Sequence, residues 1–328
     1  MSEPLNALFF AFKKRERSGV LLRAALAYVI VLVAIMALFA VAFWAPISNF
    51  AAWYGQVVTT MSTTTDPTAI QAVPPPPGMA LIMPIALLYM FVIFVLLAAW
   101  EAACLRWMLR GEVAGFWGLS LGPDTWRIYS TYWVWFGVNI GIYFALAIVI
   151  AILSAVLSAM FGQSASFAPF LLFLAALAAW LFLAVRLAPA AATSIARRKF
   201  SFFRAWSVTR ARFWPLFGAF LTIVLIYIAA AFVLGVLWFI LIYLPMMAQV
   251  ASVTAGNDPQ AAMQAYQEAM ASMFVTPIGI AKYVLMQAVG MAMSLAFYIA
   301  FFGINARAVE AAIAAGDIEV PSHEAEGT

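Results

Sequence analysis

Residues 128–185 read IYSTYWVWFGVNIGIYFALAIVIAILSAVLSAMFGQSASFAPFLLFLAALAAWLFLAV and contain no charged residue. A helix needs about 20 apolar residues to cross the hydrocarbon core of a bilayer. The run is long enough for two such helices, and Phe-Gly-Gln-Ser at residues 161–164 can form a short turn between them. The stretch therefore predicts a transmembrane helical hairpin.

The composition of the whole chain also indicates a membrane protein. Of the 328 residues, 67% are hydrophobic and 9% are charged, whereas about 25% of the residues in a soluble domain are charged. A bilayer offers the backbone no hydrogen-bond partners, so a chain can span it only as helices or as a closed barrel. Long apolar runs indicate helices, since barrel strands alternate between apolar and polar residues. We expect an all-α, polytopic transmembrane bundle.

Apolar runs with at most one charged residue give the number of spans. Six runs of suitable length predict spans at residues 24–46, 79–103, 129–160, 168–185, 213–244 and 282–306. Together they form a single membrane domain over residues 1–310. A polar tail follows at residues 311–328, and we expect it to be cytoplasmic.

The distribution of Lys and Arg predicts the orientation, because positive residues near spans stay on the cytoplasmic side. With the N-terminus inside, only Lys282 of the 17 Lys and Arg residues falls on the outer side. We therefore expect a multi-pass protein of the bacterial inner (plasma) membrane with both termini in the cytoplasm. Because the net charge of +4 follows this pattern, we expect no nucleic-acid partner.

Basic, aromatic segments occur three times and indicate a weak internal repeat. They lie at residues 5–14, 123–133 and 202–213, and each precedes a hairpin that returns to the cytoplasmic side. The hairpins end near Arg106, Arg186 and Arg307. The hypothesis is three repeats of an interfacial helix followed by a transmembrane hairpin.

The third segment carries the clearest lipid-binding pattern. Phe202, Trp206 and Phe213 lie on one helical face and are predicted to anchor it in the interface, while Arg204 lies opposite. The basic run Arg197, Arg198 and Lys199 comes just before. We expect these three residues and Arg204 to bind anionic lipid headgroups.

The same region resembles a known family. Its pattern is APA at 188–190, RRKFS at 197–201, RAWSVTR at 204–210 and FWPLF at 213–217. It is similar to the membrane domain fused to some bacterial glycerophosphodiester phosphodiesterases and to stand-alone, largely uncharacterised six-helix relatives. The soluble phosphodiesterase barrel, with its metal-binding acids and histidines, has no counterpart in this chain. The resemblance thus implies a membrane module and transfers no catalytic residue.

Glu101 is the acidic residue at the end of a predicted span. Three arginines, Arg106, Arg186 and Arg307, are expected at a similar depth and would repel one another without an acid among them. We predict that Glu101 pairs with one or more of them in a structural ion cluster. A proton-transfer site for transport would lie deeper in the membrane.

Two polar residues are expected inside spans, Asn139 and Gln287. Buried polar residues in membranes are often functional, but an amide also serves to hydrogen-bond one helix to another. Neither side chain is ionisable, so the helix-to-helix role is favoured over a substrate path.

The sequence offers no set of residues for a cofactor or for catalysis. The chain has a single cysteine, Cys104, and a single histidine, His323, which are too few for a typical cysteine–histidine metal site. A cluster of methionines could bind copper, but methionine is an ordinary filler of apolar space. No phosphate-binding loop, dinucleotide fingerprint, zinc-protease motif or nucleophile elbow is present. We expect neither a cofactor nor an enzyme.

The leading hypothesis is a non-enzymatic membrane protein that binds anionic lipid and serves envelope or lipid homeostasis. It could act by holding a protein partner or by forming a homo-oligomer. The alternative is a transporter of a small apolar or lipid-like substrate, with the absence of buried charge as the main objection.

Overall fold

The computed structural model describes residues 4–13, 19–63, 74–76, 78–161, 168–254, 265–266, 268 and 276–320. Every named element in this part of the chain is helical. The short elements are α1 (Pro4–Leu8), η1 (Phe10–Phe12), α8 (Ala190–Ala196), η3 (Phe202–Arg204), α9 (Ala205–Thr209) and the π-helix η4 (Phe239–Tyr243). The longer ones are α2 (Val20–Ala42), α3 (Trp44–Thr63), α5 (Met79–Arg110), α6 (Pro123–Phe161), α7 (Ala168–Leu187), α10 (Phe213–Trp238), α11 (Leu244–Thr254) and α13 (Pro277–Ala314).

Six helical stretches are long and apolar enough to cross a membrane. They are Val20–Ala42, Met79–Arg110, Pro123–Met160, Phe170–Ala196, Phe213–Ser252 and Pro277–Ala314. The predicted all-α, polytopic fold is therefore confirmed. The first predicted span is interrupted, because α2 ends at Ala42 and a separate helix, α3, begins at Trp44 inside it.

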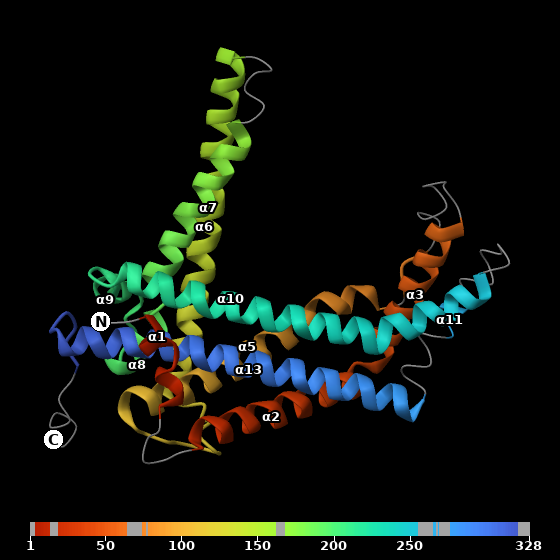
Figure 1. Ribbon diagram of the computed structural model, residues 1–328, viewed down its shortest axis with the longest axis horizontal. Coiled ribbons are helices and arrows are strands. Elements are labelled where there is room, and N and C mark those ends of the chain that lie inside the picture. Colours follow the sequence, from red (N-terminus) through yellow and green to blue (C-terminus); the bar gives the residue numbers. More distant parts are fainter. Residues whose placement is uncertain are drawn as a thin grey trace.

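The helices form two arms that diverge from a common end (Figure 1). Helices α2, α5, α10 and α13 pack side by side in one arm. The α6–α7 hairpin forms the second arm and points away from the first, while α1, α8 and α9 gather where the arms meet (Figure 1). We call this meeting point the basic end, because ion-paired arginines gather there: Arg106, Arg110, Arg127, Arg198 and Arg212.

The densest packing lies at the basic end. Trp100 is fully buried, with its ring 4.8 Å from that of Tyr28 and 5.4 Å from that of Phe302. Gly303 lies so close to η1 that an added Cβ would be 2.7 Å from the Cβ of Ala11. Only glycine allows this approach of η1 to α13.

The outer surface of both arms is apolar. Phe144 on α6, for example, is 68% exposed, and many large apolar side chains on the other long helices are exposed as well. A soluble protein rarely exposes an apolar surface of this extent. The arrangement is that of a protein whose outer surface faces lipid.

The predicted repeat of interfacial helices needs a correction at its second member. Residues 123–133 are not a separate helix but the first turns of the continuous helix α6. Asp124, Thr125 and Ile128 on one face of this segment are buried, whereas Trp126 and Trp133 are exposed, so one face packs on protein. Residues 5–13 and 202–209 do form short elements before α2 and α10, whereas Lys14 lies outside the described residues.

The boundary predicted between the membrane domain and the tail falls inside a helix. Helix α13 continues past residue 310 to Ala314. Beyond it, Ile318 is buried, and Asp317 forms an ion pair with Arg212, with 2.6 Å between Oδ2 and Nη1. The first part of the tail thus packs on the bundle, while residues 321–328, with His323, lie outside the described residues.

Candidate functional site

An ion-pair network at the basic end joins α5 to α6. Asp124, near the start of α6, pairs with Arg110 and also lies near Arg106 of α5, with 3.6 Å between Oδ2 and Nη1. Its other oxygen is 2.5 Å from Nη1 of Arg127. The side chains of Asp124 and Arg106 are only 9% and 5% exposed. Removing one partner of such a buried network would leave charges uncompensated, so the network fixes the helix junction.

The predicted ion cluster around Glu101 is wrong. Glu101 is buried, and its carboxylate accepts a hydrogen bond of 2.5 Å from the Tyr132 hydroxyl of α6. Among the described residues it forms no ion pair with Arg106, Arg186 or Arg307. The spacing of Glu101 and Arg106 explains part of this, because residues five apart on a helix do not share a face.

The three arginines each find a different environment. Arg106 belongs to the Asp124 network and also donates to the Gly118 carbonyl at 2.8 Å. Arg307 pairs with Glu310 one helical turn later, at 2.6 Å. Arg186 has no carboxylate partner in the described part of the chain and lies among aromatic rings instead.

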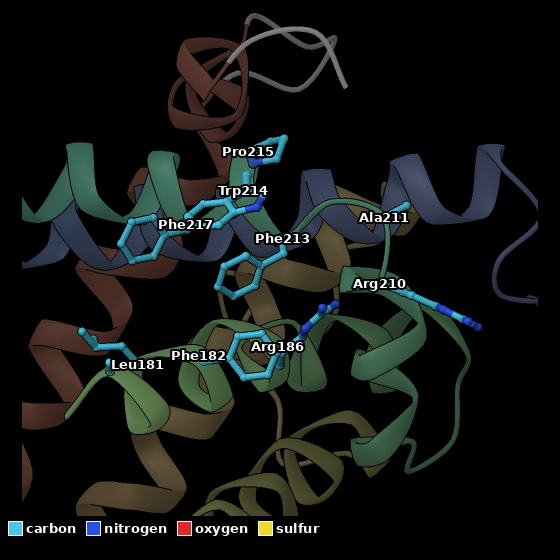
Figure 2. Close-up of a pocket in the computed structure, with 10 residues that line it drawn as sticks. Leu181, Phe182, Arg186, Arg210, Ala211, Phe213, Trp214, Pro215 and Phe217 are labelled. Atoms are coloured by element: carbon cyan, nitrogen blue, oxygen red, sulfur yellow. The ribbon is translucent and has the colours of Figure 1, made fainter. Parts of the chain in front are cut away.

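The aromatic pocket around Arg186 is shown in Figure 2. The guanidinium carbon is 5.0 Å from the ring centroid of Phe182 and 5.2 Å from those of Trp206 and Phe213. One Nη donates to the Thr209 carbonyl at 2.8 Å, while the buried Nε has no hydrogen-bond partner. The rings thus stabilise the cation by cation–π contact, while its N–H donors are only partly satisfied.

The pocket itself, here named the Arg186 pocket, lies between α7 and the start of α10. Its volume is about 550 Å³. Its wall is mostly apolar and includes Leu181, Trp214 and Pro215. Arg210 lines the rim and extends away from Arg186 toward the exterior (Figure 2). The pocket thus combines a half-buried cation, a second exposed cation and an apolar wall.

Two of the four predicted headgroup residues already have partners in the protein. Arg198 pairs with Glu112 at 2.7 Å, and Arg197 donates to the Ser201 hydroxyl at 3.1 Å. Lys199 and Arg204 are exposed at the basic end. Arg197 and Arg198 therefore help to hold the loop between α8 and α9, whereas Lys199 and Arg204 keep the accessibility that lipid contact requires.

The three predicted interfacial anchors lie in different environments. Phe202 is buried against Leu187 and Ala190, so its assignment as a lipid-facing anchor is wrong. The buried face of the segment runs from Phe202 along the short helix α9, which packs on α7. Trp206 is exposed and Phe213 is half-buried, and both rings lie over Arg186.

The two in-membrane amides also differ. Asn139 accepts a hydrogen bond of 2.8 Å from the Trp180 indole of α7, which is the helix-to-helix bond predicted for it. Gln287 is exposed and donates to the Tyr283 hydroxyl on its own helix at 3.0 Å. Its described hydrogen bond thus stays within α13, contrary to the prediction.

A second cavity, here named the inter-arm cavity, opens where α6 and α7 diverge from α5 and α13. It has a volume of about 680 Å³. Aromatic side chains form most of its wall, and its polar lining includes Glu101, Tyr132, Asn139 and Asn305. Asn305 is 2% exposed, and its Oδ1 accepts no hydrogen bond.

Sequence reasoning missed the counter-ion Asp124 and the role of Arg210. A signal existed for Asp124, because it lies three residues before Arg127 on a predicted helix, a spacing at which two side chains can pair. Asn305 had no such signal, since its burial depends on helices that are distant in sequence.

The chemistry of these sites cannot be transferred from a relative. The resemblance of residues 188–217 to the membrane domain of glycerophosphodiester phosphodiesterases remains a prediction. In the described part of the chain, no three His, Cys, Asp or Glu side chains lie together in a way that could hold a metal ion. Comparison of the chain with models of protein families, with curated proteins and with solved structures found no match.

Proposed function

We propose that this chain is a non-enzymatic protein of the bacterial inner membrane, with both termini in the cytoplasm, that binds anionic phospholipid in the Arg186 pocket. Through this binding it serves envelope or lipid homeostasis, alone, as a homo-oligomer or with a protein partner. One observation carries the proposal. Arg186 is a half-buried cation with a buried, unpaired Nε and no carboxylate partner among the described residues.

The electrostatics of Arg186 favour an anion. A guanidinium has five N–H donors in one plane, and the Thr209 carbonyl accepts one described hydrogen bond. Three aromatic rings lie 5.0–5.2 Å from the guanidinium carbon, and among the described contacts only one Nη donates a hydrogen bond, so the other Nη is available to an acceptor. A phosphate accepts two parallel hydrogen bonds from a guanidinium edge and also neutralises the charge. A lipid phosphate therefore suits Arg186 in both geometry and charge.

The surroundings of Arg186 suit a lipid better than a free anion. The apolar wall formed by Leu181, Trp214 and Pro215 offers a surface for the glycerol and the first acyl carbons. Exposed cations at the same end, Arg210, Lys199 and Arg204, add attraction to an anionic leaflet, at about 1 kcal/mol each.

The test measures lipid retention by native mass spectrometry after release from nanodiscs of mixed phosphatidylglycerol and phosphatidylcholine. Arg186→Gln removes the cation and replaces it with a neutral, polar amide. Loss of charge-assisted hydrogen bonds worth about 1.5–3 kcal/mol predicts a decrease in phosphatidylglycerol retention of about 10- to 100-fold.

The matched control is Lys199→Gln, which removes the same charge from an exposed position and should decrease retention much less. Arg186→Lys, which keeps the charge but loses the planar edge, should fall between the wild type and Arg186→Gln. A thermal melt of each variant excludes unfolding as the cause. Equal retention in Arg186→Gln and Lys199→Gln would reject the Arg186 pocket as the lipid site.

The alternative function, transport of a small apolar or lipid-like substrate, is supported by the inter-arm cavity. A pocket of about 680 Å³ with an aromatic wall is of a size that binds small molecules. Proteoliposomes loaded with a fluorescent monoacylglycerol, a lipid-like substrate without charge, test it. Saturable flux would favour transport, whereas flux equal to that of protein-free liposomes would oppose it.

A further inference from the structure

We propose that the inter-arm cavity binds a neutral lipid with a hydroxyl-bearing head, of the monoacylglycerol type. This site is separate from the Arg186 pocket and does not depend on anionic-lipid binding there. Its lining joins residues of α5, α6 and α7 with residues of α13, where the two arms begin to diverge. A lipid could therefore enter sideways from the hydrocarbon phase.

The polar groups of the cavity call for a ligand that donates hydrogen bonds. The amide oxygen of Asn305 is buried and accepts no hydrogen bond. The carboxylate of Glu101 accepts one, from Tyr132, although a carboxylate offers about four acceptor sites. An unsatisfied buried acceptor is costly, so a donor supplied by the ligand stabilises both the site and the complex.

The same residues argue against an anionic head. No Lys or Arg is among the residues that line the cavity, so a phosphate or a fatty-acid carboxylate would meet Glu101 without a compensating cation. Like charges at close range in a low-dielectric site repel strongly. A head with two hydroxyl groups provides one donor for each acceptor and adds no charge.

The rest of the cavity suits an acyl chain. Aromatic side chains of α5, α6, α7 and α13, including Phe94, Trp135 and Phe301, line the wall. A chain that enters from the hydrocarbon phase gains packing contacts with these rings but little hydrophobic free energy, and this term is the same for any head. Head-group preference therefore isolates the contribution of Glu101 and Asn305.

The experiment compares four oleoyl probes that share one chain and differ in the head: monoolein, methyl oleate, oleate and oleylamine. Binding to the full-length protein in a mild detergent is measured by native mass spectrometry. The wild type should bind monoolein at least ten-fold more tightly than methyl oleate, and oleate should not exceed methyl oleate. Equal binding of monoolein and methyl oleate would overturn the proposal, as would a preference for oleylamine over monoolein.

The key variant is Asn305→Leu, which replaces the unpaired acceptor by an apolar side chain of similar size and should reduce the preference for monoolein to about two-fold or less. The matched control, Gln287→Leu, removes an exposed amide from the same helix and should leave the preference unchanged. If Asn305→Leu does not fold, Tyr132→Phe serves as the second variant, because it frees a further acceptor site on Glu101. A full monoolein preference in Asn305→Leu would contradict the assignment. Because the two tests use different lipids and different variants, phosphatidylglycerol with Arg186→Gln and monoolein with Asn305→Leu, failure at one site is distinguishable from failure at the other.

Discussion

Substitution of Asp124 by Asn should destabilise the protein more than any other single loss of charge at the basic end. Asp124 is the carboxylate that Arg106, Arg110 and Arg127 share. After the change Arg110 keeps Glu112 at 3.1 Å, but Arg106 has no remaining carboxylate partner among the described residues. Breaking a buried ion pair costs about 3–5 kcal/mol, because it leaves a charge uncompensated. Since Arg110 remains paired, we expect about 3 kcal/mol.

The free energy of unfolding can be measured by titrating the protein with SDS in mixed micelles and following helicity. Glu310→Gln is the matched control, because it removes one negative charge from an ion pair with Arg307 whose side chains are 34% and 51% exposed. Exposed pairs contribute about 0–1 kcal/mol. A loss of less than 1 kcal/mol in Asp124→Asn, or equal losses in the two variants, would refute the view that this network fixes the α5–α6 junction.

Three further predictions concern packing, polar contacts and topology. Gly303→Ala should lower the free energy of unfolding by about 1–3 kcal/mol in the same SDS titration, because the new methyl group would lie 2.7 Å from the Cβ of Ala11. The control Gly290→Ala should be neutral or stabilising, since the nearest atom to its new methyl group is at 3.8 Å. Asn139→Leu should cost about 0.6–2 kcal/mol by loss of the bond between α6 and α7, and a loss no larger than that of Gln287→Leu would contradict this. Topology reporters fused between α5 and α6 or between α7 and α10 should give a cytoplasmic signal, and a reporter fused between α6 and α7 should give an external one. A cytoplasmic signal from the reporter between α6 and α7 would mean that these two helices do not span the membrane.

The helices were predictable because the signal for them is local. The charge-free run at 128–185 needs no tertiary information to indicate a hairpin, and α6 and α7 occupy it. The divergence of this hairpin from the other long helices (Figure 1) was not predictable. It depends on which helices pack together, and apolar side chains that face lipid look the same in the sequence as those that face another helix.

The sites were harder to predict because a charged side chain can pair with residues that are distant in the sequence. Glu101 was assigned to arginines at a similar depth, yet its direction on α5 brings it to Tyr132. Phe202 was assigned to lipid from helical periodicity, but the segment is a 3-10 turn followed by one turn of α-helix. A periodicity of 3.6 residues does not describe such a segment. Arg186 is predicted in the same ion cluster as Arg106 and Arg307, but in the structure it lies among aromatic rings.

The most informative measurement is a cryo-EM structure of the protein in nanodiscs that contain phosphatidylglycerol. The proposal predicts phosphate density beside the free edge of the Arg186 guanidinium, at a hydrogen-bond distance of about 3 Å, with acyl density along Leu181 and Trp214. The same density should be missing from the Arg186→Gln variant. A pocket that holds only acyl chains, or an Arg186 side chain neutralised by a carboxylate of the protein, would contradict it.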